Sequence, residues 1–294
     1  MKRAVLFLIA LGASAHAKTN VVVTIQPYYS IIKNIAGDRA EVTRMVPVGA
    51  SPETFSPAPA DIKTLSRAQL VFMNGLGLDE WLTGVIKNSG TKAKVLEFGE
   101  VLKFKPILAE EHAGETEEEH HDEHGHEGTD PHIFLDASLM ALAATRAGAE
   151  LARVDPKNAA YYQQRAKAEN QKLLKLHAEL KSTLGQVKGQ NIVTFHGAFN
   201  YFARAYGLKV AAAIEPFPGK EPSARYVTDV VKLIRSKKVK AVFAEPQLPE
   251  TAAKTIAESA GVKLFVLDPE GSKLSSDYYG MMRYNRDTLL KALK

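Results

Sequence analysis

The residues with the most chemical character form a dense tract of histidines and carboxylates near the middle of the chain. Five of the nine histidines lie in it, and nine carboxylates lie between Glu110 and Glu127. The histidines of the tract are His112, His120, His121, His124 and His126. Because short His-rich tracts are a compositional signal for metal binding, we predict that this tract collects metal ions. The alternative is a solvated acidic loop whose histidines have no function.

The tract lacks the residues that a folded segment needs. No large apolar side chain occurs in it before Ile133, so it cannot bury enough surface to become ordered alone. We therefore predict a disordered loop over residues 110–130. An ordered apolar run begins in the sequence Asp-Pro-His-Ile-Phe-Leu-Asp at 130–136. This places His132 at the exit of the tract, where we predict a fixed metal ligand.

The elements that must position such ligands alternate between strands and helices. Short β-branched and apolar runs, typical of buried strands, occupy 21–25, 42–46, 70–73, 94–98, 191–195, 208–214, 241–244 and 263–267. Helical patterns separate them, and this alternation indicates parallel βαβ units. The predicted fold class is therefore α/β, with two similar βα lobes that each contain a parallel sheet.

Two helical patterns in the middle of the chain, 137–154 and 157–184, connect these halves. The second carries Leu173, Leu176, Leu180 and Leu184 at helical spacing, and it would be roughly 40 Å long, a rigid strut between lobes. We predict an N-terminal lobe over 18–136, linking helices over 137–185 and a C-terminal lobe over 186–294.

In open α/β sheets, ligands bind beyond the carboxyl ends of the strands. Four candidate metal ligands lie at or near such positions, two for each lobe, so they would converge in the interlobe cleft. They are Glu53, His132, His196 and Asp268. Imidazole suits zinc, whereas carboxylate oxygens also suit manganese or iron. Asp136 and Glu245 are alternative carboxylate ligands. Each candidate could instead have only a structural role, as a solvated loop residue, a residue that opens a helix or a helix cap.

The N-terminus indicates secretion. Met1-Lys2-Arg3 is followed by a short apolar run and the small residues that end at Ala17, which is the pattern of a cleaved signal peptide over 1–17. The chain contains no cysteine, so we expect no disulfide, no thiolate metal site and no lipid anchor. A periplasmic protein is predicted.

Charge and motifs argue against two other classes of function. The net charge is +5, but the lysines are spread along the helices and no basic–aromatic motif occurs, so we expect no nucleic-acid binding. The chain has no H-E-x-x-H, G-x-S-x-G or G-x-x-x-x-G-K-[ST] motif, which disfavours an enzyme.

The order of the motifs resembles one known family. The chain contains, in sequence, Met-Val-Pro-Val-Gly-Ala-Ser-Pro at 45–52, Asn-Gly-Leu at 74–76 with Trp81, and the run at 130–136 described above. Phe-His-Gly-Ala-Phe-Asn-Tyr-Phe at 195–202, Phe-Ala-Glu-Pro-Gln at 243–247 and Leu-Asp-Pro at 267–269 complete the series. Over the whole mature chain this is similar to the zinc and manganese solute-binding proteins of ABC transporters (ZnuA/TroA-like), with the His-rich loop of the zinc branch.

The resemblance implies two lobes, a rigid linking helix and one divalent cation in the cleft. The family commonly has a histidine at the first ligand position, where this chain has Glu53. The resemblance also associates histidine at the position of His196 with zinc and glutamate there with manganese. We therefore expect Zn²⁺, with Mn²⁺ less favoured.

The predicted function is high-affinity capture of Zn²⁺ in the periplasm by a monomer that docks peripherally at the inner membrane and delivers the ion to an ABC transporter permease. The alternatives are a manganese- or iron-binding member of the same family, a periplasmic zinc buffer or adhesion module, and a zinc hydrolase. In this interpretation the tract at 112–126 is an accessory that holds ions beside His132 or senses zinc excess.

Overall fold

The computed structural model describes residues 18–108, 128–215, 219, 221–275 and 277–294. The predicted signal peptide and the five histidines of the tract lie outside the described residues. Residues 128–130, which the predicted loop includes, are described. Thr129 forms an antiparallel bridge with Leu108, and the Asp130 N–H donates to the Ile107 carbonyl at 2.8 Å.

The N-terminal lobe is built on a four-stranded parallel sheet in the order β2-β1-β3-β4. Its strands are β1 (Thr19–Val23), β2 (Ala40–Arg44), β3 (Leu70–Met73) and β4 (Lys94–Glu97). The helices between and after them are α1 (Gln26–Ala36), α2 (Pro59–Ser66), α3 (Trp81–Ser89) and α4 (Phe98–Val101). Parallel pairing requires these crossover connections, since consecutive strands must run in the same direction.

The C-terminal lobe repeats this topology, with the order β6-β5-β7-β8. Its strands are β5 (Asn191–Thr194), β6 (Lys209–Ala213), β7 (Ala241–Ala244) and β8 (Lys263–Val266). Its helices are α7 (Asn200–Tyr206), α8 (Ala224–Ser236), α9 (Thr251–Ala260) and α10 (Tyr278–Leu293). The prediction of two similar α/β lobes with parallel sheets is confirmed.

The strands β1 and β2 begin and end two residues before their predicted positions. Pro27 lies in the first turn of α1, where proline is favoured because its ring pre-sets the helical φ angle. The helix therefore begins at Gln26, and Thr24 and Ile25 form the turn that leads into it.

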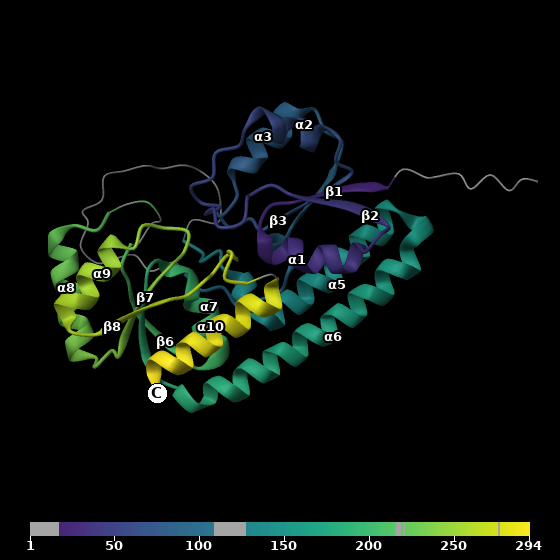
Figure 1. The fold of residues 1–294 in the computed structure, drawn as a ribbon. Helices are drawn as coiled ribbons and strands as arrows, with labels where there is room; N and C mark the ends of the chain where they lie inside the picture. The colour runs from purple at the N-terminus through teal and green to yellow at the C-terminus, as the bar shows by residue number, and fades with distance from the viewer. Residues whose placement is uncertain (1–17, 109–127, 216–218, 220, 276) are drawn as a thin grey trace, which may run out of the picture.

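Two packed helices join the lobes (Figure 1), α5 (Ala137–Val154) and α6 (Ala159–Leu184). With 26 residues, α6 is about 39 Å long and runs along both lobes. Its leucines Leu173, Leu176, Leu180 and Leu184 are all buried, as the helical spacing predicts. None of the helices within the described ranges is long and apolar enough to cross a membrane.

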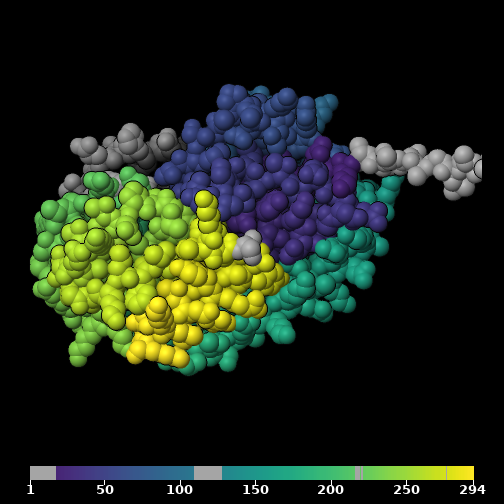
Figure 2. Space-filling view, viewed as in Figure 1, coloured from purple at the N-terminus to yellow at the C-terminus, as the bar shows by residue number. Residues whose placement is uncertain are grey.

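Each lobe has a small apolar cluster of its own, but the main core is shared by both lobes. One apolar cluster contains Phe72 of the first sheet, Phe243 of the second, Leu151 of α5, Leu180 of α6 and Leu289 of α10. Figure 2 shows that the surfaces of the two lobes also meet directly. Opening the lobes widely would expose part of this shared core to water, which opposes large hinge motions.

The crossing of α5 and α6 gives a testable prediction. A Cβ atom added at Gly148 would lie 2.2 Å from the Cβ of Ala166, so Gly148→Ala must push the helices apart. Overpacking of this kind costs about 1–3 kcal/mol, and we expect a lower free energy of unfolding in urea. Gly84 in α3 is the control, because a Cβ there meets nothing within 4 Å. Gly84→Ala should stabilise the protein by up to about 1 kcal/mol through helix propensity. Equal effects of the two variants would contradict the close crossing.

Candidate metal centre

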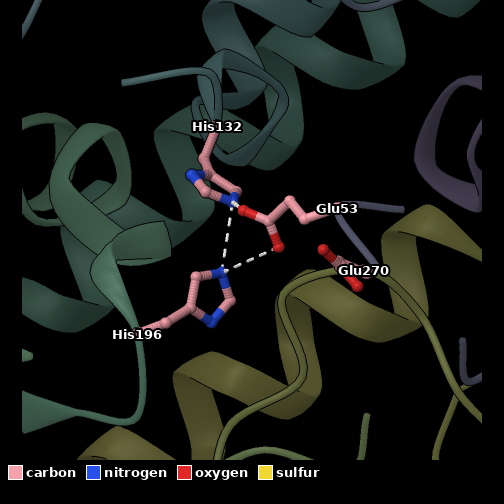
Figure 3. Close-up of side chains that lie close together, drawn as sticks. All are labelled: Glu53, His132, His196 and Glu270. Atoms are coloured by element: carbon pink, nitrogen blue, oxygen red, sulfur yellow. Dashed lines mark hydrogen bonds and ion pairs between the residues drawn. The ribbon is translucent and has the colours of Figure 1, made fainter. Parts of the chain in front are cut away.

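Four side chains that are distant in sequence meet between the lobes. Glu53, His132, His196 and Glu270 each offer one ligand atom, and these atoms all lie within 4.8 Å of one another. Figure 3 shows the two imidazoles facing each other, with both carboxylates pointing into the same space. Three of the predicted ligands are thus brought together, and Glu270 joins them.

All four residues lie in segments that connect strands and helices, outside the regular elements. Glu53 belongs to the loop after β2, His196 follows β5 by two residues, and Glu270 follows β8 by four. His132 precedes a short 3₁₀ turn (Ile133–Leu135) that leads into α5. The carboxyl ends of the parallel strands in both lobes therefore supply the centre, as the rule for open α/β sheets predicts.

Buried carboxylates orient both imidazoles. The Nδ1 atom of His132 lies 2.9 Å from Asp130 Oδ1, and that of His196 lies 2.5 Å from Glu245 Oε2. The same carboxylates also accept backbone N–H bonds from the histidines they orient. Because a carboxylate accepts hydrogen bonds, each Nδ1 carries a proton, and each Nε2 is left with its lone pair free to bind a metal.

The two Nε2 atoms lie only 3.2 Å apart. Two lone pairs that face each other at this distance repel, so a positive charge is required between them, either a proton or a metal cation. Burial lowers the pKa of His132, but the carboxylates of Asp130 and Glu53 outweigh burial and hold this pKa well above 6.5. The pKa of His196 is also raised, since Glu245 and Glu53 outweigh its burial. The raised pKa values favour a proton between the imidazoles in the metal-free protein, in a place that also suits a cation.

The two glutamates supply the negative charge of the centre. Glu53 Oε1 lies 3.5 Å from His132 Nε2, and Oε2 lies 3.9 Å from His196 Nε2. Although burial raises the pKa of Glu53, the two histidines lower it to about 2, so Glu53 is ionised. Burial and the charge of Glu53 raise the pKa of Glu270 well above 4.5.

Glu270 fits a cation site for a further reason. It is only 3% exposed, and neither of its carboxylate oxygens has a hydrogen-bond partner. A buried polar group without a partner is unfavourable by about 1–3 kcal/mol, and more when charged, and native structures seldom contain one without a function. Two buried imidazoles and two carboxylates are suitable ligands for a first-row divalent metal ion.

The structure does not bring Asp268 into this group. Its Oδ1 atom accepts hydrogen bonds from Gln247 Nε2 at 2.8 Å and from the Gly271 N–H at 2.9 Å. Its Oδ2 atom accepts one from the Ser272 hydroxyl at 2.7 Å. The Asp268 carboxylate thus shapes the loop that carries Glu270, and its assignment as a ligand stays a prediction.

The two alternative carboxylates have structural partners. Glu245 orients His196, as described above, and Asp136 accepts hydrogen bonds from Ser138 at the N-terminus of α5. The sequence reasoning missed Glu270 and the orienting role of Asp130. Glu270 is a second carboxylate in Leu-Asp-Pro-Glu-Gly, two residues beyond Asp268. This signal was present, but only the loop conformation shows which carboxylate points into the centre.

Comparisons with known proteins agree with this geometry. The family described as "ZnuA: Zinc-uptake complex component A periplasmic" matches residues 21–292. The manganese ABC transporter substrate-binding lipoprotein PsaA of Streptococcus pneumoniae is 30% identical, over 95% of this chain and 90% of that protein. The zinc-binding protein AdcA of Streptococcus pyogenes serotype M3 is 30% identical over 94% of this chain, but this match spans 56% of AdcA. The crystal structure of ZnuA superposes with a TM-score of 0.81 and 25% identity, covering 95% of this chain and 100% of that one.

The pair Glu270 and Asp268 gives a test of the ligand assignment. Glu270→Gln replaces a buried carboxyl group whose oxygens have no hydrogen-bond partner, so we expect a metal-free protein that is at least as stable at neutral pH and binds zinc about 100-fold or more weakly. Asp268→Asn should lower the stability of the metal-free protein, because it disturbs three hydrogen bonds. Competition titrations and urea unfolding measure both quantities. If Asp268→Asn abolished binding and Glu270→Gln left it intact, Asp268 would be the ligand.

The raised pKa of the histidines predicts the pH dependence of binding. Metal binds the neutral imidazoles, so protons must leave on binding, and the affinity falls as the pH drops through the raised pKa. Because these pKa values lie above 6.5, the affinity should begin to fall at a higher pH than for a free histidine. Calorimetry in buffers with different ionisation enthalpies counts the released protons, which should be more numerous at about pH 6 than at about pH 9. His177→Gln on α6 is the control and should release the same number as the wild type.

Proposed function

Because the chain belongs to the family of zinc-uptake complex component A, whose members are solute-binding proteins and not enzymes, we propose that it captures Zn²⁺ and delivers it to an ABC transporter permease. Metal is the cargo of such a protein, and the centre between the lobes is where it would bind. We propose Glu53, His132, His196 and Glu270 as the ligands.

The observation that carries this proposal is the convergence of the two imidazoles. Their Nε2 atoms face each other at 3.2 Å, and a buried carboxylate holds each ring in place. Such an arrangement is unfavourable without a positive charge between the rings and favourable with one. Three of the ligands are also buried and Glu53 is partly buried, which strengthens their attraction for a cation by excluding water.

The preference for zinc over manganese rests on the imidazoles. For a given set of nitrogen and oxygen ligands, affinity rises from Mn²⁺ to Zn²⁺, and His196 supplies the second nitrogen at the position that the family resemblance associates with zinc. Manganese is the second candidate. Glu53 and Glu270 offer four carboxylate oxygens together, which with two nitrogens suit the higher coordination number of manganese, and PsaA is named as a manganese protein.

Ion release is proposed to need only small movements. The shared core of the lobes opposes a wide opening, whereas the loops that carry Glu53 and Glu270 touch across the boundary through one backbone hydrogen bond, from the Gly49 N–H to the Gly271 carbonyl at 3.2 Å. Breaking this contact would separate two ligands without exposing the core.

The N-terminus and the His-rich tract at 112–126 bear on where the protein works and on how it collects ions. We propose that residues 1–17 are cleaved and that the protein works in the periplasm. PsaA is named a lipoprotein, so the expectation of no lipid anchor stays a prediction. The histidines at 112–126 are proposed to hold additional ions weakly beside His132, apart from the buried centre.

The experiment compares the mature protein with a variant that lacks residues 112–126. Competition titration should show one tight zinc site in both proteins. This site should bind manganese at least about 100-fold more weakly than zinc. The mature protein alone should bind further zinc ions with low affinity.

His196→Ala serves as the control, because it removes one proposed ligand and leaves the tract unchanged. It should lose the tight site and keep the weak ones. Manganese binding as tight as zinc binding would favour the second candidate, and the absence of any tight site would refute metal capture.

A further inference from the structure

The connection from β3 together with the first residue of α3, residues 74–81 (called the 74–81 loop below), touches the backbone beside two of the proposed ligands. We propose that Asn74 and Trp81 are positioning residues of the metal centre, which hold His132 and Glu53 in place from this one loop. The inference rests on the proposed function, since it concerns how the same centre is kept ready for its ion.

Asn74 holds the segment that carries His132. Its side-chain amide Nδ2 donates to the Pro131 carbonyl at 3.0 Å and to the Gly75 carbonyl at 2.7 Å. Carbonyl oxygens only accept hydrogen bonds, so the NH₂ group must face them. Its Oδ1 atom then accepts from the Tyr28 hydroxyl at 2.8 Å. Asn74 is fully buried, so this orientation is determined on all sides, and the peptide bond that enters His132 is fixed with it.

Trp81 holds the loop that carries Glu53. Its indole Nε1–H donates to the Pro52 carbonyl at 3.0 Å, which is the peptide bond that enters Glu53. The Trp81 ring also packs against Phe55, with ring centroids 4.9 Å apart. The Glu53 segment is therefore held on both sides of the ligand, by a hydrogen bond before it and by an aromatic contact after it.

The 74–81 loop is itself rigid. The buried carboxylate of Asp79 accepts from the N–H groups of Asn74 and Gly75, both at 2.8 Å. Burial raises the pKa of Asp79 to about 6 despite these bonds. Gly75 has a φ of 75°, and a Cβ there would collide with Glu97. Leu76 has a φ of 57°, and among the described residues only Leu76 and Lys238 are non-glycine residues with positive φ. Such strain persists only where the surroundings determine the backbone.

Because the 74–81 loop holds the segments of two ligands, its structure should affect metal binding. Glu53 and His132 come from segments far apart in sequence, and each meets the same loop at the peptide bond before the ligand. Their separation is then set by the 74–81 loop. A change that loosens one contact should weaken metal binding without removing any ligand.

The sharpest test is Trp81→Phe, which keeps an aromatic ring beside Phe55 but removes the indole N–H donor to Pro52 together with part of the ring system. We expect roughly fivefold weaker binding of Zn²⁺ and Co²⁺ in competition titrations. The visible absorption spectrum of the Co²⁺ form should also change, because it reports ligand geometry. The gain in Tm on metal binding should shrink, while the Tm of the metal-free protein changes little.

Tyr162→Phe is the matched control, since it removes a donated hydrogen bond to Asp155 at the α5–α6 turn. It should leave affinity and spectrum unchanged.

A double-mutant cycle shows whether Trp81 acts through Glu53. In a Glu53→Gln background, Trp81→Phe should cause no further loss of Co²⁺ affinity, because coupled residues are not additive. Asn74→Ser is a second variant with the same expected spectral change. Wild-type affinity and spectrum in Trp81→Phe, or an equal loss in both backgrounds, would overturn the positioning role. A wild-type protein that binds no metal would instead refute the proposed function.

Discussion

The metal centre, and the loops that form it, depend on two imidazoles whose free nitrogens are directed at the same point. Asp130 and Glu245 fix the rings of His132 and His196, so neither ring can turn its lone pair away. Burial prevents water from relieving the repulsion. The 3.2 Å gap between the Nε2 atoms must then hold a positive charge, and the raised pKa of each histidine expresses the same requirement for a proton.

The fold supplies this arrangement by placing strand ends from both lobes against each other. The segments after β2, β5 and β8 contribute Glu53, His196 and Glu270, and His132 comes from the segment that leads into α5. The apolar core that runs through both sheets and α5, α6 and α10 then keeps the two sets of loops at one separation. A site assembled across two lobes with independent cores would vary in geometry with every hinge motion.

Readiness for a cation has a cost in the metal-free protein. Glu270 is buried without a partner for either oxygen, and the charge of the nearby Glu53 makes its ionisation less favourable. These side chains are held by their surroundings in positions that favour the bound state. This is the usual relation between a binding site and stability, in which polar groups that would be satisfied by the ligand remain unsatisfied without it. The hydrogen bonds of Asn74 and Trp81 to the ligand segments belong to the same arrangement.

The sequence by itself determined the local features of this protein. The alternation of apolar runs and helical patterns predicted two parallel α/β lobes, because strand and helix periods are properties of neighbouring residues. The position of His196 after an apolar run, and of His132 between the His-rich tract and an apolar run, marked them as candidates for the same reason. The choice between Asp268 and Glu270 was different, since both carboxylates follow the same strand within four residues. Only the tertiary structure shows which of the two faces the histidines, because hydrogen bonds from Gln247, Gly271 and Ser272 hold the Asp268 carboxylate in the loop and the Glu270 carboxylate lies near the imidazoles. Gln247 is distant from Asp268 in sequence, and the residues that Glu270 faces come from three other segments, so the spacing of residues along the chain does not contain these positions.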